Sequence, residues 1–144
     1  MTELSLDAAQ TMVTAALAHA RAGHFKPVAV VVLDARGAWK CVACEDGTSL
    51  KRAEVAHGKA YGALALGMGT RSLGKRAREQ AYFIAAVSHM AGPLVPVPGG
   101  VLIRDQNGTV LGAVGISGDT SENDEAAACA AIAAAGMVAD PGAD

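Results

Sequence analysis

The sequence predicts an α+β fold in which an antiparallel sheet is flanked by helices, in the order αββααββα. Two pairs of apolar segments, within residues 28–44 and 101–116, are each joined by a short turn and resemble β-hairpins. Segments with apolar residues at helical spacing precede, separate and follow these pairs. Because hairpins pair neighbouring strands antiparallel, this order argues against a doubly wound parallel sheet.

Length and composition indicate one folded domain over residues 1–144. The chain is 51% hydrophobic and 18% charged, which excludes a disordered protein. No apolar run approaches the ~20 residues of a membrane span, and a net charge of −2 gives no basic surface for nucleic acid. The acidic first residues lack the basic segment of a signal peptide, so we expect a cytoplasmic location.

The first half of the chain predicts a helix followed by a hairpin. Apolar residues recur at helical spacing over residues 5–22, and Ser5 is a suitable N-cap. The β-branched run 28–33 is typical of a buried strand. The turn at residues 34–37 then leads into a partner strand at 38–44.

The second half repeats this pattern with two helices before the hairpin. Helices are expected at about 49–66 and 74–90, separated by a glycine-containing turn. The second hairpin joins 101–104 to 109–116 through an Asn-Gly turn. The last helix, about 121–136, is predicted to open with a capping box formed by Ser121 and Asp124.

Cys41 and Cys44 form a C-x-x-C pair, a spacing found in redox and zinc sites. A redox pair needs its first cysteine at a helix N-terminus, whereas these two residues end a predicted strand. No second pair completes a zinc site, because Cys129 stands alone. With an odd total of three cysteines, we interpret all of them as structural and expect no disulfide framework and no metal site.

Cations at the start of the second helix form the first candidate site. Lys51 and Arg52 follow the helix start, where the helix dipole disfavours positive charge. An anionic ligand held by exposed N–H groups and these cations would explain them, and a solvated basic face would explain them equally well. Asp46, in the turn before the helix, is the third candidate ligand-binding residue.

A second candidate group lies further along the same helix. Glu54, His57 and Tyr61 are spaced to share one face, whereas Lys59 falls on another side. A carboxylate one turn from an imidazole can orient the ring and raise its pKa, as in a general base. Tyr61 could donate to a developing oxyanion, and Lys59 could transfer protons. The alternative is that His57 merely packs or faces solvent.

Several segments together resemble the GlcG/HbpS-like family, the haem-degrading domain that is also the C-terminal module of PduO-type adenosyltransferases. They run in the family's order from residue 28 to 125 and include the strand and turn 30–37, Ala56-x-x-Lys59-Ala60, 98–100, and 110–118 with Asp124-Glu125. The resemblance implies a profilin-like αββααββα fold and a homo-oligomer. Some relatives bind haem or cobalamin-related tetrapyrroles, so haem is the cofactor that the resemblance suggests.

Three functions therefore remain open for a chain of this kind. The first is an oligomeric domain that binds haem or another anionic small molecule, with His57 as the best-placed axial ligand for haem iron. The second is a cofactor-independent enzyme that acts on a small carboxylate or carbonyl compound through Glu54 and His57. The third is an accessory oligomer without a ligand. Alanine-rich helix faces also favour self-association.

Overall fold

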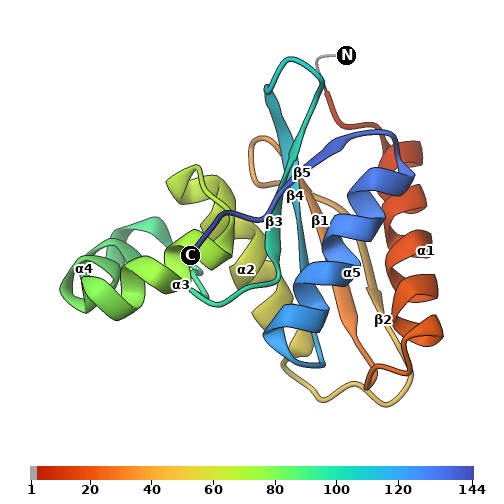
Figure 1. Cartoon of the computed structure of the whole chain (residues 1–144), viewed down its shortest axis with the longest axis horizontal. Helices are drawn as coiled ribbons and strands as arrows, with labels where there is room; N and C mark the ends of the chain where they lie inside the picture. Colours follow the sequence, from red (N-terminus) through yellow and green to blue (C-terminus); the bar gives the residue numbers. More distant parts are fainter. Residues whose placement is uncertain (1–2) are drawn as a thin grey trace.

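The computed structural model describes residues 3–144, so the first two residues of the acidic N-terminal segment lie outside the described chain. It confirms the predicted α+β class and the order of the predicted elements (Figure 1). None of the helices in residues 3–144 combines the length and hydropathy that a membrane crossing requires. The elements are α1 (Leu6–Ala22), β1 (Ala29–Asp34), β2 (Trp39–Cys44), α2 (Arg52–Leu66), α3 (Thr70–Glu79), α4 (Ala81–Ala91), β3 (Gly100–Arg104), β4 (Val110–Ser117), α5 (Ser121–Ala134) and β5 (Val138–Asp140).

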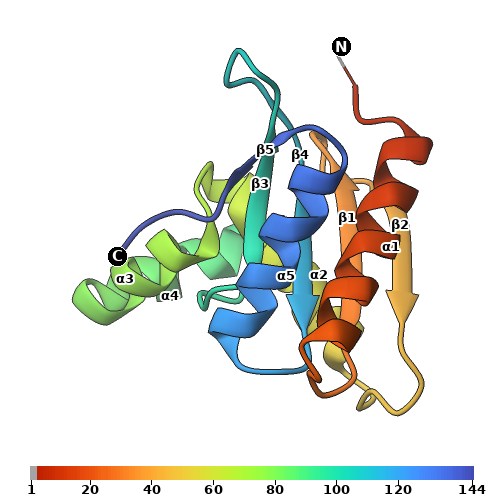
Figure 2. The ribbon, with the colours of Figure 1, turned by 45° about the vertical axis from the view of Figure 1, so that its right-hand side comes forward.

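The sheet has the order β2-β1-β4-β3-β5, and every neighbouring pair is antiparallel. Each predicted hairpin is present, and β1 lies beside β4 in the middle, with Val31 opposite Gly115. Helices α1 and α5 cover one face of the sheet, and α2 covers the other (Figure 2). Because β1 is buried on both faces, its sequence is a continuous apolar run rather than an alternating one.

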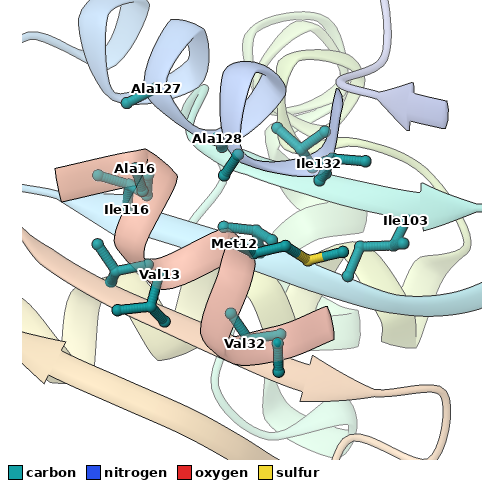
Figure 3. Packing of buried hydrophobic residues seen from close by; sticks show 14 of the residues in the cluster. Met12, Val13, Ala16, Val32, Ile103, Ile116, Ala127, Ala128 and Ile132 are labelled. Atoms are coloured by element: carbon teal, nitrogen blue, oxygen red, sulfur yellow. The ribbon is translucent and has the colours of Figure 1, made fainter. Parts of the chain in front are cut away.

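The larger core lies between the sheet and the helices α1 and α5. Met12 of α1 and Ile132 of α5 pack there against Val32 and Ile103 of the sheet (Figure 3). Small residues of both helices, such as Ala16 and Ala128, let the backbones approach closely. The predicted N-cap of α1 is confirmed, since the Ser5 hydroxyl accepts a hydrogen bond from the Ala8 amide at 3.1 Å.

Helix α2 lies unusually close to the other face of the sheet. Ala56, Ala60 and Ala63 of its inner side pack on β1, β3 and β4. Gly115 of β4 has to lack a side chain, because a Cβ there would overlap the carbonyl oxygen of Ala56. This close approach fixes α2 against the strands and so determines which of its residues face inward and which face outward.

The single helix predicted at 74–90 is wrong, because the chain forms two helices, α3 and α4, with a break at Gln80. Gln80 has φ −140° and ψ 61°, which ends one helix and begins the next. The Arg76 guanidinium donates to the Gln80 side chain and stacks 3.9 Å from the Phe83 ring. These side-chain contacts hold the break without a glycine or proline, so no local pattern in the sequence indicates it.

Two further details of the C-terminal region differ from the sequence predictions. The N-cap of α5 is Thr120, whose hydroxyl accepts from the Asn123 amide, so the predicted Ser121–Asp124 capping box is wrong. Asp124 instead turns inward, where its two carboxylate oxygens contact Lys59 Nζ and the Asp119 amide. The edge strand β5, which was not predicted, pairs with β3, and the segment after it contacts α3 through Asp144 and Arg71.

Candidate functional site

Helix α2 divides the predicted site residues between two opposite environments. Glu54, His57 and Tyr61 lie on its outer side, as their spacing predicts, and Lys59 lies on its inner side against the sheet. The structure therefore does not bring Lys59 together with Glu54 and His57. The roles predicted for these residues depend on what each environment does to their chemistry.

The outer side of α2 carries an aromatic stack formed by Trp39, His57 and Tyr61. The Trp39 and His57 rings are parallel within 6°, with their centroids 4.2 Å apart, and Tyr61 follows at 5.5 Å from His57. Trp39 reaches α2 from the start of β2, where it pairs with Leu33 on the same face of the sheet. Its side chain is 54% exposed, so the stack is open to solvent on one side.

Burial under this stack lowers the pKa of His57 below its usual value, which favours the neutral imidazole at pH 7. The predicted rise of the His57 pKa through Glu54 is therefore wrong. Glu54 turns back along the helix instead, and its carboxylate accepts from Lys51 Nζ at 3.0 Å. Within residues 3–144, no hydrogen bond joins Glu54 to His57, and the two ring nitrogens of His57 have no protein partner.

On the inner side, Lys59 and Asp124 form an ion pair whose side chains are only 3% and 2% exposed. Lys59 Nζ lies 3.2 Å from Asp124 Oδ2 and donates to the Ile116 carbonyl at 2.9 Å. The second oxygen of Asp124 accepts from the Asp119 amide at 3.0 Å. Burial lowers the pKa of Lys59, and Asp124 opposes that shift. This network ties α2 to the end of β4 and to the start of α5.

The two cations at the start of α2 also separate. Lys51 points outward to Glu54, whereas Arg52 reaches across to Ser117 and donates to its hydroxyl at 3.1 Å. Arg52 also lines a hollow of about 220 Å³ together with Lys26, Thr48, Ser49 and Gly118. Two cations and two hydroxyl side chains around this space suit a carboxylate or another small anion. The sequence drew no attention to Lys26, which is distant from Arg52 in the chain.

Asp46 lies apart from the aromatic stack, in a different hollow of about 460 Å³ that Arg21 and Glu45 also line. Glu45 is fixed there, since it accepts from Arg21 Nε at 2.8 Å and from the Val28 amide at 2.9 Å. Nearby, Cys44 is exposed, whereas Cys41 packs toward the α1 side of the sheet. Among residues 3–144, no group of three His, Cys, Asp or Glu side chains could hold a metal ion.

Trp39 is the main site residue that the sequence analysis missed. It is the only tryptophan in the sequence and lies at the start of a predicted strand. Its separation from His57 in the sequence, however, matches no periodic spacing that would predict a contact between the two rings. Ser117 was missed for the same reason, because its partner Arg52 lies 65 residues away. Asp124 belonged to the family pattern, but only the structure reveals its pairing with Lys59.

A comparison with models of known protein families identifies the family of the chain. The model of haem-degrading HbpS-like proteins matches residues 4–133, which is most of the sequence. The chain belongs to the HbpS-like family. No curated protein matches it significantly.

Several solved structures are similar to this chain over nearly its whole length. A PduOC–haem complex is 30% identical, with a TM-score of 0.84 over 94% of this chain and 96% of that one. The Klebsiella pneumoniae protein ORFY is 25% identical, with a TM-score of 0.83 over 94% and 92%. A double mutant of HbpS from Streptomyces reticuli is 25% identical, with a TM-score of 0.80 over 92% and 87%. This HbpS-like chain therefore has the predicted family fold.

Proposed function

We propose that this HbpS-like chain binds haem on the surface formed by α2 and β2, with His57 as the ligand to the iron. The observation that carries the proposal is the aromatic stack, in which a half-buried imidazole without a protein hydrogen-bond partner lies parallel to an exposed indole. Family membership and the haem complex of the similar PduOC structure support it.

The chemistry of this surface fits a porphyrin in two respects. Iron is bound by neutral imidazole, and burial favours this form because it lowers the pKa of His57. Trp39 and Val42 project from the same face of β2 as exposed apolar side chains, which suit a large apolar macrocycle. When bound, haem would supply an iron centre that this chain lacks, and the residues around His57 would exclude water from one side of it.

Cationic side chains at the start of α2 could pair with the negatively charged carboxylates of haem. Lys51 is 69% exposed, and its ammonium group pairs with Glu54 at the surface, where a haem carboxylate could take the place of Glu54. Arg52 and Lys26 border the hollow of about 220 Å³, where a carboxylate could accept from the guanidinium. A ligand with an apolar plane and carboxylates is therefore the class that this end of α2 suits best.

The acid–base alternative has less support from the same residues. Glu54 is engaged with Lys51, and Lys59 is held inside the fold by Asp124. A reaction that needs both Glu54 and Lys59 at one substrate would therefore require both ion pairs to break and Lys59 to leave the inner side of α2.

Haem titration followed by absorption spectroscopy tests the proposal. We expect a saturable, shifted Soret band with the wild-type protein and at least a tenfold weaker affinity for His57→Ala. The matched control is His24→Asn, which removes an exposed imidazole while asparagine tolerates the φ of 57° at that position. An unshifted Soret band with stoichiometric wild-type protein, or equal affinity in His57→Ala, would contradict the proposal.

A further inference from the structure

The hollow of about 220 Å³ that Arg52 borders lies where segments that are distant in the sequence meet. Lys26 comes from the link between α1 and β1, and Thr48 and Ser49 come from the loop before α2. None of the described residues that line this α2 hollow is an Asp or a Glu. The hollow therefore presents two cations and two hydroxyl groups without a carboxylate in its lining.

Arg52 differs from every other arginine of residues 3–144 in its partners. The others pair with carboxylates, except for Arg76, which contacts Gln80 and the Phe83 ring. Within the described chain, Arg52 makes one hydrogen bond, from Nη1 to the hydroxyl of the buried Ser117 at 3.1 Å. This contact holds the guanidinium beside the hollow and leaves most of its N–H donors for another acceptor.

The charged groups around Arg52 do not balance its charge. Burial lowers the pKa of the neighbouring Lys59, Asp124 opposes this shift, and the positive charge of Arg52 adds to it. The Asp124 carboxylate already accepts from Lys59 Nζ, and the Asp119 carboxylate accepts from the Lys26 amide at 2.8 Å. An anion in the hollow would supply the negative charge that Arg52 lacks.

The start of α2 adds backbone donors beside the same hollow. No side chain caps this helix, and the Ala53 and Glu54 amides have no acceptor within residues 3–144. The Thr48 hydroxyl donates to the Glu45 carbonyl at 3.1 Å, so Ser49 is the lining residue whose hydroxyl stays free in the described chain. Free amides at a helix start favour an anion, and phosphate is a common one.

We infer that the α2 hollow binds the phosphate group of a small molecule, with Arg52 and Lys26 as the residues that balance its charge. A phosphate dianion would balance both cations, whereas a single carboxylate would balance one. A water molecule takes up about 30 Å³ in the liquid, so the hollow holds about seven non-hydrogen atoms. That is enough for a phosphate group, and any larger substituent would extend into solvent.

Phosphate binding in the hollow requires neither haem nor His57. Phosphate and a haem carboxylate would compete for Arg52, and only this consequence rests on the proposed function. We therefore expect saturating phosphate to weaken the binding of haem to the wild-type protein. The competition would make the haem affinity of the chain depend on the concentration of phosphorylated molecules.

Isothermal titration calorimetry of the haem-free chain with inorganic phosphate, at constant ionic strength and pH, tests this inference. The wild type should bind saturably with a dissociation constant on the order of 1 mM. Arg52→Gln and Lys26→Gln should each bind at least tenfold more weakly. Arg36→Gln removes the same charge from an arginine that is 83% exposed and pairs with Asp34, so it is the matched control and should stay within twofold of the wild type. Far-UV circular dichroism verifies that each variant is folded.

The inference is overturned if the wild type shows no saturable binding, if both hollow variants bind phosphate normally, or if Arg36→Gln loses as much affinity as they do. Acetate that binds as tightly as phosphate would overturn the assignment to a phosphate group.

Haem titration with and without saturating phosphate tests the competition. The wild type should lose haem affinity when phosphate is present, and Arg52→Gln should not. An equal haem affinity of the wild type with and without phosphate would overturn the competition. A protein that binds phosphate but not haem would contradict the proposed function and support this inference, and the opposite result would overturn this inference alone.

Discussion

The two sides of α2 each hold a lysine–carboxylate ion pair, and the two pairs differ in their surroundings. Lys51 and Glu54 form a pair 3.0 Å apart in which both side chains are 69% exposed. Lys59 and Asp124 form a pair 3.2 Å apart that is almost completely buried. The distances are nearly equal, so the difference between them lies in solvation and in the number of additional hydrogen bonds.

This difference in solvation suggests a structural role for the inner pair and leaves the outer side of α2 for ligand binding. Water screens the outer pair, and breaking it leaves both charges solvated. The inner pair has no water to replace a lost partner, so it acts as a structural connection between α2, β4 and α5. Ligand chemistry therefore belongs to the outer side, where His57 and its neighbours remain accessible.

Breaking the inner pair should have the largest effect. Lys59→Met leaves Asp124 buried without a counter-charge, and we expect a loss of about 3–5 kcal/mol in the free energy of unfolding. Urea denaturation measures it, and Lys51→Met, at a similar distance from its own carboxylate, is the matched control. The double variant Lys59→Met/Asp124→Leu should recover part of the loss. If Lys59→Met lost no more free energy of unfolding than Lys51→Met, the two ion pairs would not differ in their contribution to stability.

Opening the aromatic stack should have an intermediate effect that is visible in pH dependence. Trp39→Ala exposes His57, so the His57 pKa should rise toward 6.5, which NMR titration of the ring protons can follow. In the wild type the unfolded chain takes up this proton first, so stability should fall as the pH drops from 6.5 through the lowered pKa. That fall should shrink in Trp39→Ala, which also loses about 1 kcal/mol of stacking. An unchanged His57 pKa would show that Trp39 does not control it.

Removing the outer carboxylate should have the smallest effect. Glu54→Gln should change the free energy of unfolding by about 0.5 kcal/mol or less, and added salt should abolish the difference. The His57 pKa should stay the same, because the carboxylate contacts Lys51 instead of the imidazole. A drop in the His57 pKa in this variant would restore Glu54 as the partner of a general base.

Local patterns in the sequence were sufficient to predict most of the fold. The Asn-Gly turn, the β-branched run of β1 and the Ser5 cap each act within a few residues. Their structural effects can therefore be predicted from neighbouring residues in the sequence. At the Gln80 break, Arg76, Gln80 and Phe83 have the spacing of a continuous helix, so the sequence pattern does not distinguish two helices from one. The edge strand β5 depends on pairing with β3, which is distant in the sequence. They were consequently missed.

The candidate site was predicted less completely, for a related reason. Helical spacing correctly put Glu54, His57 and Tyr61 on one side of α2 and Lys59 on another. Spacing says nothing about partners from other elements, however, and these decide the chemistry. Burial lowers the pKa of His57, which stacks on Trp39 of another element, and Asp124 of α5, 65 residues away in the sequence, pairs with Lys59.

The central position of β1 beside β4 has a consequence for synthesis on the ribosome. Ala29 pairs with Ser117, so about 80 residues must be translated after β1 before its second neighbour exists. At roughly 5–20 residues per second, this interval lasts several seconds or more. During that time an apolar strand destined for the middle of the sheet has only β2 to pair with. Nascent chains of this fold therefore expose one edge of β1 until β4 is synthesised, and this edge is a site for aggregation during that interval.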